Sequence, residues 1–403
     1  MRPWLDPWFR RATWFTIAVI GWAGLIWIGV MLASMSPPRA GDDLRVLVDA
    51  ARRLVEGSPL YTSAPAGDSL VAESLFYSYP PPVAQVLVPV SGLRLEVILV
   101  LWGAGASAGL AFVARLLRRP ARSLVLPALA LAPYTVPFAV ALLFGNLDAW
   151  FPLAFGLVLV GVLAQAPRAT VAGGIALGAV SVAKLHPFTL ALWLIARGAR
   201  RRRHAPEVDL AAVALVTGLG IVAASLLAGG SGPWADYLAF LRSGAATADL
   251  VGGLNIGPAS QLALLLGLDD GAARSIQVPV LLVALGVTIA AGWRVHDPVV
   301  SFGLAVTASL VVLPVTWVHY PVALIPVAIA AAARAAGTNR SQVGGLLAAA
   351  IVVAALAVVV PPVMWVAVAL VLAAAYRTGP VASGMPIQPT AGAEAADGAR
   401  GNG

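Results

Sequence analysis

Long apolar runs separated by short polar loops cover most of the chain. Because a helix needs about 20 apolar residues to cross a bilayer, this pattern predicts an all-α polytopic membrane protein. We expect a bundle of about 12 transmembrane or re-entrant helices. They run over residues 13–35, 97–116, 124–142, 148–165, 170–184, 187–198, 208–230, 275–293, 298–316, 319–335, 342–360 and 362–376.

Two of these segments, 170–184 and 187–198, are too short to be full crossings. We interpret them as a re-entrant hairpin with residues 184–187 at its outer apex, since irregular backbone at membrane depth is tolerated where it lines a polar cavity. Residues 80–93 are also short and begin with three prolines, which predicts a re-entrant or interfacial helix.

The loop after the first span contains an amphipathic helix. Apolar side chains recur at helical spacing on one face, and charged side chains occupy the other. We expect this helix to lie on the outer membrane surface. Its apolar positions are Leu44, Leu47, Val48, Ala51, Leu54 and Val55.

Composition agrees with a membrane protein. The chain is 60% hydrophobic and 11% charged, with a mean hydropathy of +0.89. It has no cysteine, which excludes disulfides and thiolate metal sites. The net charge of +8 comes from arginines in short loops, a pattern typical of cytoplasmic loops and not of nucleic-acid binding. We therefore expect a plasma-membrane protein with a cytoplasmic N-terminus, whose unusual polar residues collect on the extracytoplasmic face.

Lys184 is the only lysine of the chain and lies inside an apolar run. A charge in such a run costs about 2.5–3.5 kcal/mol and persists with a partner or a polar cavity. His186 follows two positions later. This cationic cluster predicts an anionic ligand that enters from the lipid; the alternative is a lysine that extends to the membrane surface.

Several short motifs resemble those of glycosyltransferase family 87, in the same order. They are GDDLRVLVDAARRLVEGSPLY, FYSYPPPVAQVLVP, GNLD at 145–148, AKLHP at 183–187 and TWVHY at 316–320. The resemblance covers roughly residues 40–320. It implies a GT-C fold and a transferase that uses a polyprenyl-phosphate sugar, as in the actinobacterial mannosyl- and arabinofuranosyltransferases. Asn146 and Asp148 depart from the more usual Gln and Asn of the family.

The resemblance matches Asp43 to the family's catalytic aspartate, and we expect it to act as the base. Lys184, His186 and His319 are expected to stabilise the donor phosphate as fixed donors in a low-dielectric site. Simpler interpretations are an N-cap for Asp42 or Asp148, a carbonyl partner for His186, and an interfacial position for His319 and the tyrosines. Possible acceptor or sugar contacts are Asp42, Tyr79, Asn146, Asp148, Asn255 and Trp317.

The expected function is transfer of a sugar, mannose in first place, with inversion to an α-linkage on a cell-envelope glycolipid or glycan. An arabinofuranosyltransferase is the alternative within the family, and a lipid-linked-sugar transporter or flippase is the alternative outside it. We expect no cofactor, with a divalent ion as the other possibility, and no nucleic-acid partner. Residues 1–377 are expected to form one GT-C-like transmembrane catalytic domain, and residues 378–403 a disordered cytoplasmic tail.

Overall fold

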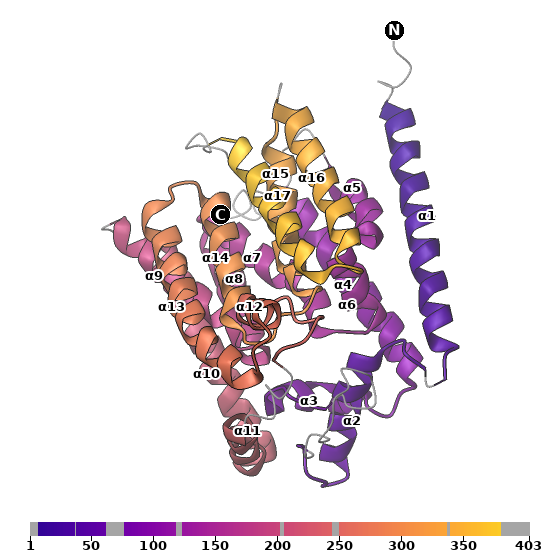
Figure 1. Ribbon diagram of the computed structural model, residues 1–403, viewed down its shortest axis with the longest axis vertical. Helices are drawn as coiled ribbons and strands as arrows, with labels where there is room; N and C mark the ends of the chain where they lie inside the picture. The colour runs from indigo at the N-terminus through magenta and orange to yellow at the C-terminus, as the bar shows by residue number, and fades with distance from the viewer. Residues whose placement is uncertain are drawn as a thin grey trace, which may run out of the picture.

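The computed structural model describes residues 7–36, 38–61, 76–117, 123–201, 205–243, 250–336 and 339–379. Within these ranges every regular element is a helix, so the predicted all-α class is confirmed (Figure 1). Most of the predicted tail over 378–403 lies outside the described residues.

Six of the described helices are long and apolar enough to cross a membrane. A bent pair, Val125–Tyr134 followed by Val136–Leu143 with an angle of 73°, makes a seventh if it counts as one span. The chain is therefore a multi-pass membrane protein, whereas the expected total of about 12 also includes shorter helices. The six are α1 (Pro7–Ala33), α4 (Leu95–Leu116), η5 with α7 (Leu147–Trp150 and Phe151–Ala164), α10 (Pro206–Gly229), α13 (Asp270–Arg294) and α16 (Asn339–Leu356).

The remaining helices are short. The bent pair is α5 (Val125–Leu131) with η4 (Ala132–Tyr134), followed by α6 (Val136–Leu143). The others are α2 (Asp42–Val55), α3 (Pro81–Leu87), η3 (Val88–Val90), α8 (Pro167–Ala183), η6 (His186–Phe188), α9 (Thr189–Arg200), α11 (Gly232–Ser243), α12 (Pro258–Leu266), α14 (Pro298–Val312), η8 (Tyr320–Leu324), α15 (Ile325–Arg334), η9 (Pro361–Val363) and α17 (Met364–Arg377).

The helix break at Lys184 lies where the sequence predicts the apex of a hairpin. Helix α8 ends at Ala183, and Lys184 has extended backbone before η6 begins. Helix α8 packs against α7 and α10, whereas α9 packs mainly against α13 and also contacts α10. Lys184 therefore lies at the break between two helices that share α10 as a neighbour.

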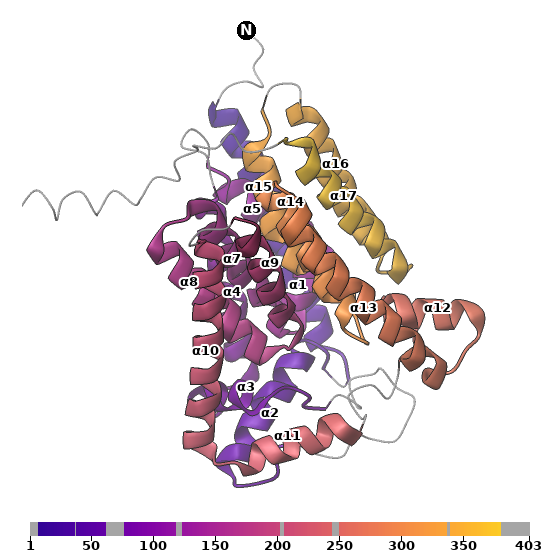
Figure 2. The ribbon, with the colours of Figure 1, turned by 90° about the vertical axis from the view of Figure 1, so that its left-hand side faces the viewer.

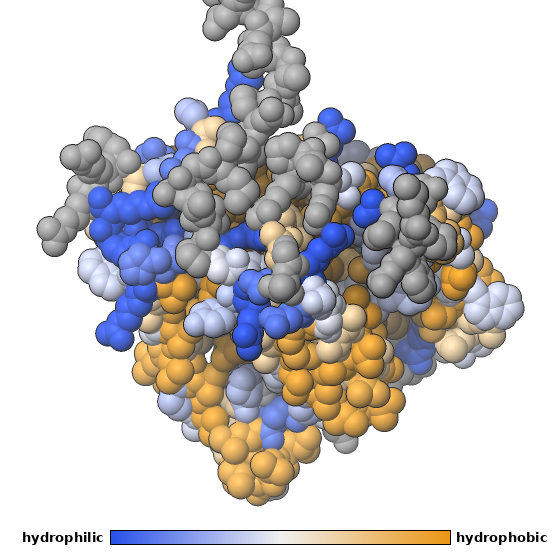
Figure 3. Space-filling view, turned by 90° about the horizontal axis from the view of Figure 1, so that it is seen from above, coloured by the Kyte–Doolittle hydropathy of each residue, from blue (hydrophilic) through white to orange (hydrophobic). Residues whose placement is uncertain are grey.

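Arginines bind several helix ends together at one end of the bundle, which we call the arginine end. The Arg197 guanidinium donates to the carbonyls of Val295 and His296. The Arg334 guanidinium pairs with Asp297, which also caps α14. Seen from above, hydrophilic side chains gather over part of this face, and the rest of it is hydrophobic (Figure 3). The short helices α2, α3 and α11 collect at the opposite end (Figures 1 and 2).

The predicted amphipathic helix forms as α2, but other helices of the protein cover its apolar face. Leu44 and Val48 are buried against Ile98 of α4, and Leu47 packs with Val83 of α3. Only the last apolar position, Val55, is largely exposed. Protein side chains therefore cover most of this face, which its amphipathic periodicity alone does not show. The place of the helix on the outer membrane surface stays a prediction.

Candidate active site

A tight turn between α6 and α7 brings the polar groups of the site together. Gly145 has φ +66°, a backbone conformation that glycine adopts without steric cost. A Cβ atom here would lie 2.5 Å from the Leu44 Cβ. The turn therefore packs directly on the first turn of α2, which carries Asp42 and Asp43.

Asn146 links this turn to Asp43. Its Nδ2 donates to the Asp43 Oδ2 at 2.7 Å, and its Oδ1 accepts from the backbone N–H of Asp148 at 2.9 Å. Asn146 therefore caps η5, a role that the sequence alone left open for Asp148.

Lys184 pairs with Asp148. The Lys184 Nζ lies 2.8 Å from each carboxylate oxygen of Asp148, whose side chain is completely buried. His319 approaches from the other side, with its Nε2 3.3 Å from the Asp148 Oδ2. Lys184 therefore has an internal counter-charge and does not extend to the membrane surface. The sequence contains a signal for this pair, because Asp148 is the only acidic residue between Glu96 and Glu207.

Tyr320 is a residue of the site that the sequence analysis did not select. Its ring lies 4.0 Å from the Lys184 Nζ, within the range of a cation–π contact. The His186 ring stacks on it with centroids 6.3 Å apart, and the His319 ring meets it edge-on at 4.9 Å. Tyr320 thus contacts all three residues that we expected at the donor phosphate. Its local sequence gives little signal for such a role, because an aromatic residue at a span end is more often an interfacial anchor.

The two acids of the first outer loop have different surroundings. Asp42 is buried and its carboxylate pairs with the Arg45 guanidinium at 2.9 Å. Burial raises the pKa of Asp42, and Arg45 partly offsets this effect. Asp42 is not the helix cap, since α2 begins after Gly41 without a side-chain cap. Asp43 is only partly buried and has a neutral amide as its partner.

Tyr79 lies in the same polar cluster. Burial raises the pKa of its hydroxyl, and the nearby positive charge of Lys184 opposes this increase. Asp43, Asp148 and Tyr320 also act on this hydroxyl electrostatically. The Tyr61 hydroxyl donates to the Tyr79 carbonyl at 2.8 Å and holds the segment in place. The Tyr79 hydroxyl therefore remains a neutral hydrogen-bonding group beside both the acids and Lys184.

Two histidines have unused hydrogen-bonding atoms. His186 is 2% exposed, and neither of its ring nitrogens has a partner among the described residues. The expected alternative, a bond from His186 to a neighbouring carbonyl, is therefore not seen in this part of the chain. The His319 Nε2 lies near Asp148 but is outside hydrogen-bond geometry. A buried polar group without a partner costs about 1–3 kcal/mol, so both rings are suited to meet a ligand.

Two of the predicted contact residues are not joined to this cluster by a described side-chain bond. The Asn255 amide donates to the carbonyls of Leu250 and Pro314, and its oxygen accepts from the N–H groups of Gly257 and Thr316. This amide has therefore used its hydrogen-bonding capacity as a brace between two loops. Trp317 is partly buried, and its carbonyl accepts from the Tyr320 N–H.

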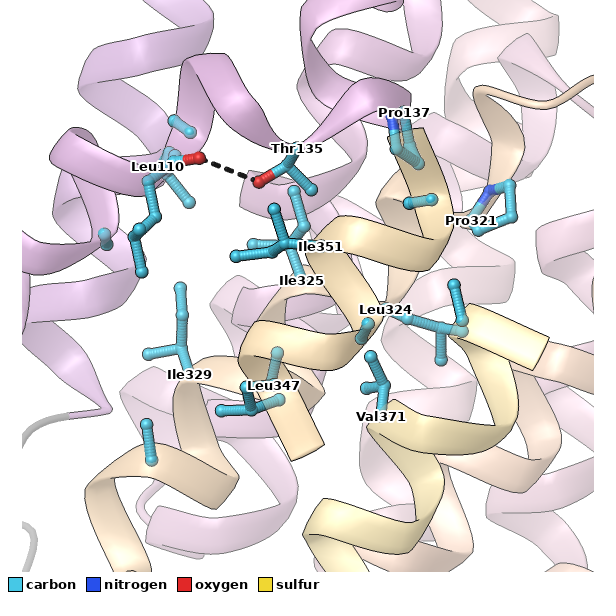
Figure 4. A pocket seen from close by; sticks show the side chains of 18 of the residues that line it. Leu110, Thr135, Pro137, Pro321, Leu324, Ile325, Ile329, Leu347, Ile351 and Val371 are labelled. Atoms are coloured by element: carbon cyan, nitrogen blue, oxygen red, sulfur yellow. Dashed lines mark hydrogen bonds between the residues drawn. The ribbon is translucent and has the colours of Figure 1, made fainter. Parts of the chain in front are cut away.

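An apolar cavity of about 180 Å³ adjoins η8, the short helix whose first residue, Tyr320, contacts the polar cluster (Figure 4). Pro321 and Leu324 of η8 line it, together with residues of α4, α5, α6, α15, α16 and α17. The only hydroxyl in its lining, that of Thr135, is bonded to the Leu131 carbonyl. Because Tyr320 precedes Pro321 directly, one short helix separates the polar cluster from a space suited to an apolar chain.

The described residues do not bring three His, Asp or Glu side chains together as a potential metal site. The carboxylates of the cluster already have partners in Asn146 and Lys184. The expectation of a site without a cofactor stays a prediction, and the divalent ion remains its alternative.

Comparison with known proteins gives a family. Residues 77–315, more than half of the chain, match the sequence model of glycosyltransferase family 87. No curated protein shows a significant match to the chain. The matched range includes Tyr79, the turn at 145–148, Lys184 and His186. Four other predicted site residues lie outside it: Asp42, Asp43, Trp317 and His319. The chain therefore belongs to glycosyltransferase family 87 and is a membrane glycosyltransferase.

Proposed function

We propose that the protein transfers mannose from a polyprenyl-phosphate donor to a hydroxyl of a cell-envelope glycolipid or glycan. The acceptor oxygen forms a bond to the anomeric carbon as the bond from that carbon to the phosphate oxygen breaks. The electron pair of the broken bond leaves with the polyprenyl phosphate, and the acceptor proton passes to Asp43. Attack opposite the leaving phosphate inverts the anomeric centre, so that a β-linked donor gives an α-linkage.

The observation that carries this proposal is the free carboxylate oxygen of Asp43, which Asn146 connects to the turn that holds Lys184. Asp42 is paired with Arg45, and Asp148 is paired with Lys184. Asp43 has only the Asn146 amide as a partner among the described residues, on its Oδ2, and it is partly exposed. A general base must reach the acceptor proton with an available oxygen, and Asp43 is the acid of the cluster that meets this condition.

The leaving phosphate requires hydrogen-bond donors. The ammonium group of Lys184 has three N–H donors. Its hydrogen bond to the Asp148 Oδ2 uses one of them, so donors remain for a phosphate. The unpartnered ring nitrogens of His186 and His319 supply further donors or acceptors. Charge that gathers on the phosphate in a site of low dielectric is stabilised more strongly by such fixed groups than it would be in water.

The cavity behind η8 supports a lipid-linked donor. Its lining is almost entirely apolar. One lining residue, Pro321, directly follows Tyr320, whose ring contacts Lys184. A phosphate at Lys184 with its isoprenoid chain in this cavity would match polar to polar and apolar to apolar surfaces. The apolar flanks of the 170–198 hairpin are the alternative path for the chain.

The distribution of arginines supports a site on the extracytoplasmic face of the plasma membrane. Helix α9 begins near the Lys184 break and ends at Arg200, so its 12 residues separate the site from the arginine end by about 18 Å. Arginine-rich loops favour the cytoplasm. With the arginine end in the cytoplasm, Asp43 and Lys184 lie toward the opposite face.

The test is transfer by the purified protein in liposomes supplied with radiolabelled polyprenyl-phosphate mannose and envelope glycolipids. Asp43→Asn should lower the transfer rate by about 10²–10⁴-fold, the range of a general base. The matched control is Asp49→Asn on the same helix, whose exposed pair with Arg52 carries no role in the site. Normal turnover by Asp43→Asn would remove Asp43 from the reaction. If product forms with a polyprenyl-phosphate arabinofuranose donor and not with the mannose donor, arabinofuranose replaces mannose in the proposal.

A further inference from the structure

Asn146 occupies the junction between the proposed base and the buried ion pair. We propose that it is a positioning residue that fixes Asp43 relative to Lys184, an inference that rests on the function proposed above. One side of its amide holds Asp43, and the other side holds the backbone of Asp148, which in turn binds Lys184. A single turn of chain thus connects α2 to the end of α8.

The hydrogen bonds fix the orientation of this amide. Because the Asn146 Oδ1 accepts from the Asp148 N–H, the Nδ2 must face Asp43. The backbone of Asn146 is held as well, since its N–H donates to the Ala141 carbonyl at 2.8 Å and its carbonyl accepts from the Trp102 Nε1 at 3.2 Å. The residue is only 5% exposed, so its neighbours leave it little freedom to rotate.

A neutral donor suits this position for a chemical reason. A cation bound to a carboxylate stabilises its charged form and weakens it as a base. Arg45 acts on Asp42 in this sense, where it offsets part of the pKa increase caused by burial. The Asn146 amide orients Asp43 without adding a charge. It occupies Oδ2 alone, so Oδ1 remains available for the acceptor proton.

The two links act together on the geometry of transfer. The acceptor hydroxyl must lie at Asp43 while the departing phosphate lies at Lys184, on opposite sides of the anomeric carbon. Asn146 and Asp148 are two positions apart on a turn whose Gly145 packs against α2. The distance between base and cation is therefore set by one short segment and not by the independent positions of two helices.

The first measurement uses Asn146→Ala. Loss of the amide should lower kcat by about 10²-fold, since a misplaced catalytic group has an effect of this order. The KM for the polyprenyl-phosphate donor should stay close to that of the wild type, because the ion pair between Lys184 and Asp148 remains intact. Gln277→Ala is the matched control, as its half-buried amide donates to the Val311 and Val312 carbonyls and to no residue of the site.

The second measurement uses Asn146→Asp, which keeps the size of the side chain but places a second carboxylate against Asp43. Two carboxylates in contact do not both ionise readily, so the acid limb of the kcat–pH profile should move upward by about one pH unit or more. Asp42 on the same helix, Tyr79 and Tyr320 also face Asp43, and all three are unchanged in this variant. Gln277→Glu is the control and should leave the acid limb in place.

The outcomes separate the positioning role from the proposed function. An Asn146→Ala protein with wild-type kcat overturns the positioning role, as does an Asn146→Asp acid limb at the wild-type pH. Thermal unfolding identifies variants that do not fold; if Asn146→Ala is among them, the acid limb of Asn146→Asp decides. Failure of the proposed function shows instead as full turnover by Asp43→Asn.

Discussion

Lys184 and Asp148 form a buried ion pair although they lie 36 positions apart in the sequence. The Asp148 side chain is fully buried, and that of Lys184 is 10% exposed. Neither charge is stable alone at such a position, because removal of one partner leaves an uncompensated charge in a medium of low dielectric. The pair therefore holds the turn after α6 to the end of α8.

The ion pair gives a stability prediction. Lys184→Met and Asp148→Asn should each lower the free energy of unfolding by about 3–5 kcal/mol. The double variant should recover most of this loss but not the transfer activity, since the donor phosphate then lacks its cation. Thermal unfolding in detergent and transfer rates measure the two effects. A double variant as unstable as either single variant would show that the pair is not the cause.

The ring of Tyr320 should matter more than its hydroxyl. Tyr320→Phe keeps the face beneath Lys184 and should retain most of the transfer activity. Tyr320→Leu removes that face, and with it a desolvated cation–π contact worth about 2 kcal/mol. We expect kcat/KM for the donor to fall by roughly 30-fold in the Leu variant. Equal losses in both variants would assign the effect to the hydroxyl instead.

The cavity behind η8 predicts a dependence on lipid length. Ala328→Phe places a ring in the cavity and should raise the KM for a long polyprenyl donor while leaving that for a short-chain donor unchanged. Val216→Phe is the control, because Val216 of α10 is exposed away from the cavity. Donor titrations with chains of two lengths give the comparison. An equal change for both lengths would exclude the cavity as the place of the lipid tail.

Gly145→Ala tests the turn itself. The substitution places an alanine at a positive φ, which costs about 1–2 kcal/mol, and its Cβ would collide with Leu44. We expect a lower unfolding temperature and a transfer rate that falls with the displacement of Asn146. The control is Gly286→Ala in α13, where a Cβ meets nothing within 4 Å and helix propensity favours alanine by about 1 kcal/mol. A Gly145→Ala protein that behaves like the control would contradict the packing of the turn on α2.

The helices were the part of the structure most open to prediction from sequence. The segment predicted over 97–116 is observed at Leu95–Leu116, because a long apolar run has few alternatives to a helix. The break at Lys184 was also expected, since a charge followed by a proline interrupts an apolar helix. The number of complete membrane crossings remains a prediction, since several apolar helices are shorter than a bilayer.

The partners of the site residues were not predictable in the same way. Asp148 reads as a helix cap in its local sequence, and only the tertiary structure brings it to Lys184. The apolar face of α2 has the period of a surface helix, and nothing in that period shows that α3 and α4 cover it. Long-range packing decides both cases, whereas sequence patterns report local geometry.

The arginine end has a practical consequence for locating the two chain ends in the cell. The Arg334 guanidinium bonds the carbonyl of Gly379, and α1 begins at the same end of the bundle (Figure 1). Reporters fused before Pro7 or after Gly379 should therefore lie in the same compartment. A fluorescent protein that matures in the cytosol should report at both ends, and a secreted phosphatase should be silent at both.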